Sequence, residues 1–180
     1  MTDRTYIALL RGINVGGKVL KMADLKDAVS PLGFTEVKTY LQSGNMVFRT
    51  PEAGNEALGK RISDAIREHK SMDVTVMVRR SDAWSKIVAA NPYPQAREFP
   101  KTVHTFILDQ MPEPARLEAL AAKEAGREEW KIVDGTLYLH TPDGFGKSAL
   151  GNLIERILKV PMTARNWNTV VALEEPDSGS

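Results

Sequence analysis

The first half of the chain alternates short apolar runs with segments whose apolar residues recur at helical spacing. The runs of strand length are Tyr6–Leu10, Phe34–Leu41, Met46–Thr50 and Val74–Arg79. Two segments between them predict helices, with apolar faces formed by Met22, Leu25 and Val29 and by Leu58, Ile62, Ala65, Ile66 and His69. The order strand, helix, strand, strand, helix, strand is typical of the ferredoxin-like fold, or α/β plait.

The second half repeats this order, with a difference at its end. Its predicted strands and helices are Thr102–Leu108, Pro114–Lys123, Trp130–Val133, Thr136–His140 and Ser148–Leu158. Asp134-Gly135 predicts a tight hairpin turn between two of these strands. Val160–Met162 is at most the stub of a last strand, and Thr163–Leu173 has the pattern of a helix with Trp167 facing inward.

These patterns predict an α+β protein of two ferredoxin-like subdomains, the second ending in a helix in place of a full last strand. Ser81 is placed to cap a short helix that ends the first subdomain. The predicted parts are residues 1–90 for the N-terminal subdomain, 91–101 for a proline-rich connection, 102–173 for the C-terminal subdomain and 174–180 for a flexible polar tail.

Two polar segments of the first subdomain are expected to meet. The helical crossover makes the first and second strands parallel, so the end of the first strand and the turn before the third lie at one edge of the sheet. Both segments are rich in groups that bind anions or planar polar ligands. These groups are Arg11, Gly12, Asn14, Gly16, Gly17 and Lys18 in the loop, and Gln42, Ser43, Gly44 and Asn45 in the turn. Glycine and asparagine also serve tight turns without any ligand, which is the structural alternative.

A third polar segment covers residues 163–169. In the predicted helix Thr163 is placed at the N-cap, and Arg165, Asn168 and Thr169 share one face. That face is either solvated or completes a site with the two loops. This segment adds Arg165, Asn166 and Asn168 to the candidate ligand-binding residues.

Composition narrows the classes of function. The 180 residues include 24 Lys and Arg against 23 Asp and Glu, and this net charge of +1 argues against a general binder of polyanions. The absence of cysteine excludes a disulfide scaffold, a thiolate nucleophile and Cys-ligated metal centres. The N-terminal apolar run is too short for a signal peptide, and no run of about 18 apolar residues is present. A cytoplasmic protein without a membrane segment is therefore predicted.

Several motifs resemble known sites without meeting their requirements. Residues 146–148 read Gly-Lys-Ser before a predicted helix, but Thr141 stands where a P-loop needs glycine, which leaves a simple anion site or a capped connection. Ser43 lacks the flanking glycines of a nucleophile elbow. The three histidines lack metal-ligand spacing, and His104 shares its strand face with apolar residues, which indicates an interior histidine. No metal and no cofactor is therefore predicted.

Three blocks of sequence are distinctive when they occur together, namely Tyr6–Lys18, Tyr40–Phe48 and Thr163–Val170. Through them the chain resembles the bacterial domain-of-unknown-function 1697 (DUF1697) family over residues 3–173. The resemblance implies a two-part α+β protein with ferredoxin-like subdomains. It also implies that Trp167 and all the candidate residues except Lys18 are family hallmarks. It implies no reaction, substrate or catalytic residue.

The leading functional hypothesis is a site for a small anionic or nucleotide-like ligand at the three polar segments. Arg11, Lys18 and Arg165 would supply positive charge, and the glycines would supply backbone N–H donors. Residues 1–90 hold 14 basic and 10 acidic side chains against 10 and 13 in residues 91–180, so two of the three segments lie in the more basic half. The alternatives are a nucleic-acid-binding module at the same edge and an interaction protein whose polar loops are structural. The third predicted strand lacks the aromatic pattern of RNA-recognition domains.

Overall fold

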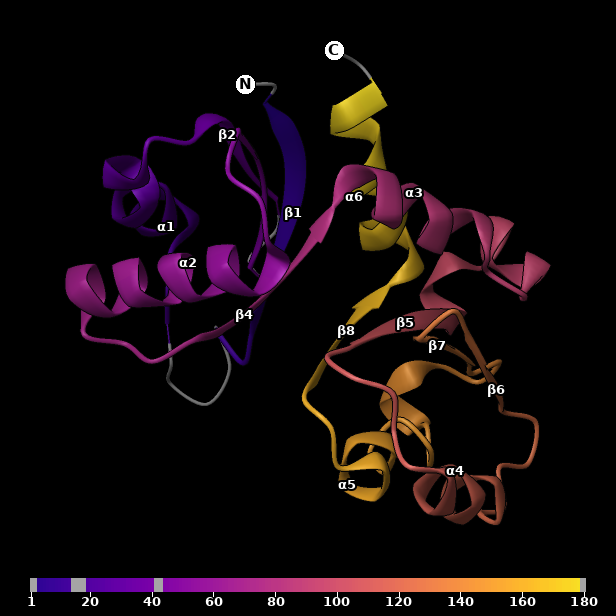
Figure 1. The fold of residues 1–180 in the computed structure, drawn as a ribbon. Helices are drawn as coiled ribbons and strands as arrows, with labels where there is room; N and C mark the ends of the chain where they lie inside the picture. The colour runs from indigo at the N-terminus through magenta and orange to yellow at the C-terminus, as the bar shows by residue number, and fades with distance from the viewer. Residues whose placement is uncertain (1–2, 14–18, 41–43, 179–180) are drawn as a thin grey trace. The chain divides into compact units, whose positions relative to one another are not determined.

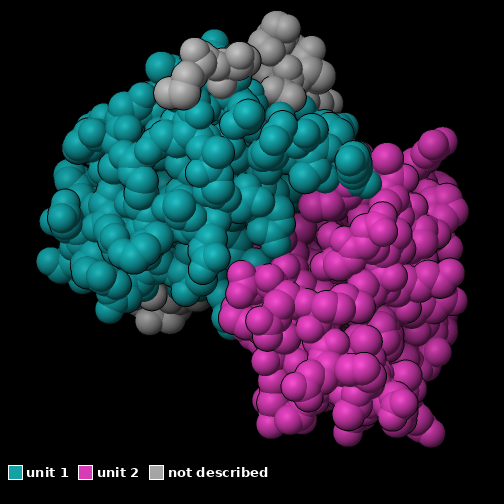
Figure 2. All heavy atoms as spheres, viewed as in Figure 1, with its two compact units in different colours: residues 1–86, 173–180 teal, residues 87–172 magenta. Residues whose placement is uncertain are grey.

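The chain folds into two compact units, Met1–Lys86 with Leu173–Ser180, and Ile87–Ala172. Figure 1 shows the ribbon of this computed structural model, and Figure 2 shows the two units as spheres. The structure describes residues 3–13, 19–40 and 44–178, except for the side chains of residues 175–178. No helix within these ranges is both long enough and apolar enough to cross a membrane.

Unit 1 is a four-stranded antiparallel sheet with two helices on one face (Figure 1). Its elements are β1 (Arg4–Arg11), α1 (Met22–Val29), β2 (Thr35–Tyr40), β3 (Asn45–Thr50), α2 (Asn55–Lys70) and β4 (Thr75–Arg80). The strand order β2-β3-β1-β4 places β1 and β3 in the centre, as the ferredoxin-like fold requires. The predicted order of elements is therefore confirmed for this half of the chain.

The central strand β1 is apolar on both faces. Tyr6, Ala8 and Leu10 belong to the core that α1 and α2 cover, and Ile7 and Leu9 are equally buried on the opposite face. This double burial explains why β1 appears in the sequence as a continuous apolar run and not as an alternation. The aromatic ring of Tyr6 adds a hydrogen bond from its hydroxyl to the Glu52 carbonyl at 2.9 Å. β1 is thus anchored on both sides and holds its C-terminal end in a fixed place.

Unit 2 repeats the same topology with its own core. After α3 (Ser81–Ala89) the elements are β5 (Val103–Leu108), α4 (Pro114–Ala121), β6 (Glu129–Val133), β7 (Thr136–His140), α5 (Ile154–Leu158), β8 (Met162–Asn166) and α6 (Trp167–Ser178). The strand order β6-β7-β5-β8 matches that of unit 1 element for element. The predicted Asp134-Gly135 hairpin turn is present, with positive φ at both residues. The α+β class with two ferredoxin-like subdomains is confirmed.

The last strand of unit 2 corrects the sequence prediction. Met162–Asn166 forms a full edge strand that pairs with β5, so residues 163–166 are extended and not helical. The polar residues Thr163 and Arg165 lie on the face opposite the α4 and α5 core and are themselves buried, which hides the strand pattern. The helix α6 begins only at Trp167 and continues to Ser178, beyond the predicted end at Leu173.

A second correction concerns the segment after β7. A helix was expected over Ser148–Leu158, but only Ile154–Leu158 is α-helical. Residues 149–153 form turns, and the Ser148 hydroxyl accepts a hydrogen bond from the Gly151 N–H at 2.8 Å. The apolar residues Leu150 and Ile154 still reach the core, so the spacing that indicated a helix reflects burial through a tight turn.

Candidate functional site

The end of β1 and the residue before β3, from which the two polar segments extend, meet at one edge of the sheet. β1 and β2 each pair antiparallel with β3 and are therefore parallel to each other. The Leu10 N–H donates a hydrogen bond of 2.8 Å to the Gly44 carbonyl, which joins the end of β1 to the turn before β3. Gly44 has φ of +88°, and a Cβ atom there would lie 2.6 Å from Ile13 Cδ1. Only glycine fits this close approach.

This edge, which we call the loop edge (Arg11–Ile13 with Gly44–Asn45), is open to solvent at Gly12 and in part at Arg11, while its other residues are buried. Arg11 is the last residue of β1, is half-buried and stands opposite Thr75 of β4. Gly12 is exposed, has φ of +71° and, among the described residues, has no heavy atom within 4 Å of the place where a Cβ would stand. The backbone of Gly12 is therefore accessible to a ligand beside the Arg11 side chain.

The Asn45 amide, another predicted ligand-binding group, has a structural contact. Asn45 is fully buried, and its Nδ2 donates a hydrogen bond of 2.8 Å to the Tyr40 carbonyl across the hairpin. This bond fixes the ends of β2 and β3 around the turn. The remaining predicted residues of the two loops lie outside the described residues, namely Asn14, Gly16, Gly17, Lys18, Gln42 and Ser43.

Arg165 of the third segment lies in unit 2 and is buried. The residue is 7% exposed, and its guanidinium Nη1 donates to Thr163 Oγ1 at 2.8 Å and to the Ala164 carbonyl at 2.9 Å. Burial lowers the pKa of Arg165 to about 10, which still leaves the side chain charged at neutral pH. The β5–β8 register places Arg165 directly opposite Thr105, whose hydroxyl has no hydrogen-bond partner among the described residues.

The two asparagines of the third segment have different environments. Asn166 is the N-cap of α6, because its Oδ1 accepts hydrogen bonds from the Thr169 N–H at 3.0 Å and the Thr169 hydroxyl at 3.2 Å. Asn168 is exposed. The predicted N-cap at Thr163 is wrong, and so is the shared helical face of Arg165, Asn168 and Thr169, because Arg165 lies on a strand.

The Gly-Lys-Ser turn of unit 2 binds a carboxylate of its own chain. Glu128 Oε1 accepts hydrogen bonds from the Ser148 hydroxyl at 2.9 Å and from the Leu150 N–H at 3.1 Å. An internal acid therefore occupies the donors that a simple anion would need. Of the two roles predicted for this segment, an anion site and a structural connection, these contacts favour the connection.

His104 is the most strongly perturbed histidine. Its ring stacks on Phe145 with 3.9 Å between ring centroids, and burial lowers the pKa of His104 to about 4. His104 is half-buried, so its environment supports a packing role over a metal-binding one. Its Nδ1 is buried without a hydrogen-bond partner in the described part of the chain. The neutral imidazole here acts as an aromatic packing group.

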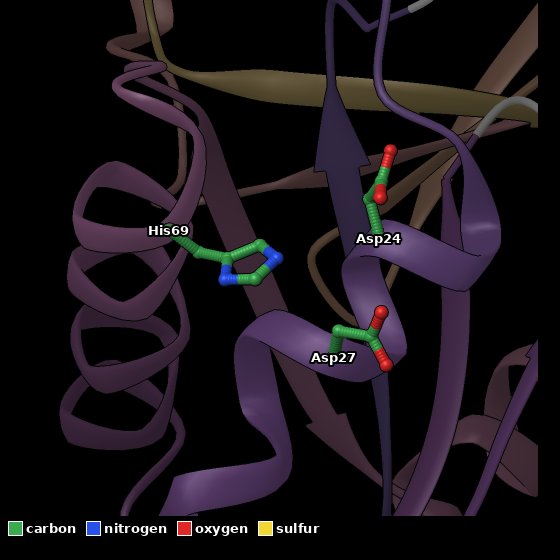
Figure 3. Close-up of side chains that lie close together, drawn as sticks. All are labelled: Asp24, Asp27 and His69. Atoms are coloured by element: carbon green, nitrogen blue, oxygen red, sulfur yellow. The ribbon is translucent and has the colours of Figure 1, made fainter.

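A cluster of metal-ligand side chains that the sequence analysis missed lies between the two helices of unit 1. Asp24 and Asp27 project from α1 and His69 projects from the last turn of α2, with the imidazole directed toward α1 (Figure 3). One ligand atom from each residue lies within 4.8 Å of the others. The spacing of Asp24 and Asp27, three residues apart on one helix face, was the available signal.

The carboxylate–imidazole cluster borders a cleft on unit 1. The cleft has a volume of about 380 Å³. Its lining residues are Asp27, Ala28, Pro31, Leu32, Arg61, Asp64, Ala65, Glu68 and His69. Arg61 is held at this cleft by an ion pair with Glu52 and by a hydrogen bond from its Nη2 to the Leu32 carbonyl.

A comparison of the chain with protein-family models shows which family it belongs to. The model of DUF1697, described as a protein of unknown function, matches residues 3–138. The chain belongs to this family. The match covers residues 3–86 of unit 1 and continues into unit 2 as far as β7, so the family resemblance is confirmed and two of its three sequence blocks lie within the match. A comparison with curated proteins finds no match.

The DUF1697 fold has a relative among the solved structures. The conserved bacterial protein SP0830 from Streptococcus pneumoniae is 19% identical and superposes with a TM-score of 0.74, covering 97% of this chain and 98% of that chain. At this identity the likeness shows a shared fold. Protein BT0572 from Bacteroides thetaiotaomicron, at 8% identity and a TM-score of 0.23, covers 90% of this chain and 92% of its own.

Proposed function

We propose that this DUF1697 protein binds a small anionic or nucleotide-like ligand at the loop edge of unit 1. The observation that carries the proposal is the Leu10–Gly44 hydrogen bond, because it holds the end of β1, next to Arg11, against the start of β3, about 30 residues away in the sequence. Arg11 at the end of β1 supplies a guanidinium that fits phosphate or carboxylate oxygens. The exposed Gly12 supplies backbone that a ligand can approach closely.

The proposed site includes fewer residues than the three polar segments that the sequence predicted to form it. Asn45 bonds across its hairpin, Asn166 caps α6, and the Arg165 guanidinium is bonded to Thr163 and Ala164. These contacts support structural roles for the three side chains. The ligand-binding role therefore rests on Arg11 and Gly12, with Lys18 and Gln42 of the adjoining segments as the further groups that the sequence predicts to contribute.

A thermal-shift screen of nucleotides, phosphorylated metabolites and carboxylic acids tests this function. A ligand at about 100 times its Kd adds about 2.7 kcal/mol of stability, which raises the Tm of a chain of this size by roughly 5–10 °C. Arg11→Gln should weaken binding by about tenfold or more, because a hydrogen bond to a charged group contributes about 1.5–3 kcal/mol. Arg4→Gln is the matched control, since Arg4 lies at the opposite end of the same strand and is exposed.

Three outcomes separate the proposal from its alternatives. A shift lost in Arg11→Gln and kept in Arg4→Gln supports a ligand site at the loop edge. A response only to oligonucleotides, with affinity that falls steeply as salt rises, would replace it with nucleic-acid binding. The absence of a shift with every compound, or a shift that is equal in both variants, would leave Arg11 without a binding role.

A further inference from the structure

We propose that Asp24, Asp27 and His69 form a binding site for a first-row divalent cation, with Zn²⁺ as the fitting representative. None of these residues belongs to the loop edge, so this inference is independent of the proposed function. The three side chains come from two helices that pack against each other, and their ligand atoms lie within 4.8 Å of one another (Figure 3). Packing of the helices therefore brings His69 to the two carboxylates, which share one face of α1.

The donor set selects the class of cation. Two carboxylates and one imidazole form a mixed oxygen and nitrogen set, which suits Zn²⁺ and its first-row neighbours better than Mg²⁺ or Ca²⁺. Bond lengths of about 2.0–2.2 Å to such a metal require donors about 3–4 Å apart. Asp24 is half-buried and both Asp27 and His69 are exposed, so rotation of the side chains can close the remaining distance.

The charges around the cluster also favour a bound cation. Asp27 lies in the last turn of α1, where the helix dipole disfavours a negative charge, and it stands three residues from the like charge of Asp24. Among the described residues, no hydrogen bond or ion pair involves the Asp27 carboxylate or the His69 imidazole. Asp24 is paired with Lys70, at 3.5 Å between Lys70 Nζ and Asp24 Oδ2. Two of the three ligands are thus available, and the third is bound by one exposed ammonium group.

The position of the cluster leaves room for further ligands. Asp27 and His69 both line the cleft of about 380 Å³, so a cation held by the three side chains would face this space. Three protein ligands complete neither a tetrahedral nor an octahedral shell, and the remaining positions would be filled by water. The site inferred here is accordingly an open, hydrated one.

Calorimetric titration of the tag-free full chain with Zn²⁺ tests the site. We expect one Zn²⁺ to bind with a Kd of 10 μM or tighter, on the order of −7 kcal/mol of binding free energy. Loss of a residue that only supports a ligand weakens metal binding by about 10–100-fold, so His69→Gln and Asp27→Asn, which remove ligands, should each weaken it by at least about tenfold. Lys70→Gln should tighten it, because the variant removes the ammonium group that competes for Asp24.

Glu68→Gln is the matched control. Glu68 is an exposed acid beside His69, lines the same cleft and is not in the cluster, so its loss should leave the Kd unchanged. Co²⁺ should give a visible absorption band with the native chain and not with His69→Gln, which reports the imidazole directly. The proposal is overturned if Zn²⁺ binds only at millimolar concentration, if Mg²⁺ binds as tightly, or if His69→Gln and Asp27→Asn bind Zn²⁺ like the native chain.

Discussion

Two neighbouring residues of unit 2, the half-buried His104 and the buried Thr105, carry polar atoms without partners in the described part of the chain. His104 and Thr105 follow each other on β5 and face opposite sides of the sheet, yet each has a buried polar atom without a hydrogen-bond partner among the described residues. Such an atom loses its water contacts and gains nothing in return, which costs about 1–3 kcal/mol. For a histidine the cost rises further when the ring is protonated, because burial disfavours the charged form.

Because the pKa of the His104 imidazole is lowered in the folded chain, we expect the stability of the protein to depend on pH. Its pKa is about 4 in the folded chain and returns to 6.5 on unfolding, so between these values the unfolded state binds more protons. The free energy of unfolding should therefore fall as pH decreases from 6.5 toward 4. Between pH 7 and pH 5 the loss due to this residue is about 2 kcal/mol by linkage. Urea unfolding at the two pH values measures it.

His104→Phe isolates this contribution from other titrating groups. Phenylalanine keeps a ring against Phe145 and removes the titrating nitrogen. The variant should lose about 2 kcal/mol less than the native chain between pH 7 and pH 5. An equal loss in both chains would show that His104 titrates alike in the folded and unfolded states.

At the scale of elements, several of the distinctive polar residues stabilise turns and helix ends. Asn45 closes the β2–β3 hairpin through the Tyr40 carbonyl, Gly44 allows that turn to touch β1, and Asn166 caps α6. These residues recur in the sequence blocks that define the family resemblance, but their contacts are internal. A distinctive polar residue on a loop is therefore not by itself evidence of a ligand.

The two asparagines of α6 allow this role to be measured. Asn166→Ala removes the side-chain acceptor of the Thr169 N–H and should lower the free energy of unfolding by about 0.5–2 kcal/mol. Asn168→Ala changes an exposed residue of the same helix and should stay within about 0.5 kcal/mol of the native chain. Chemical denaturation of both variants gives the comparison, and equal effects would contradict a capping role for Asn166.

The pattern of apolar residues predicted a helix or strand correctly where the element buries apolar side chains on one face or on both. It failed where the element buries polar side chains. β1 and the β6–β7 hairpin follow from an apolar run and an Asp-Gly turn. β8 was missed because Thr163 and Arg165 are buried polar residues on an edge strand. The helix expected over residues 148–158 is limited to Ile154–Leu158, because turns at 149–153 bury apolar residues at helical spacing.

At the scale of the whole molecule, the chain forms two units of the same topology, and one of these units is not continuous in sequence. Unit 1 takes its last residues from the far end of the sequence, because Leu173–Ser180 clusters with residues 1–86. The sequence predicted a division into consecutive parts, since local patterns carry no information on which unit a terminal segment joins. The Asp24–Asp27–His69 cluster was missed for the same reason, because it depends on contacts between distant helices.

Because unit 1 includes the C-terminal segment, we expect the loss of a buried C-terminal side chain to destabilise the strands of unit 1. Leu173 is completely buried, and Leu173→Ala should destabilise the protein by about 2–5 kcal/mol through the lost contacts and the cavity. Because Leu173 belongs to unit 1, native-state hydrogen exchange should lose protection chiefly in β1, β3 and β4. Leu120→Ala is the matched control, since Leu120 is equally buried within the core of unit 2 and should reduce protection in β5 and β7. If Leu173→Ala instead lowered protection in the strands of unit 2 alone, the C-terminal segment would belong to that unit.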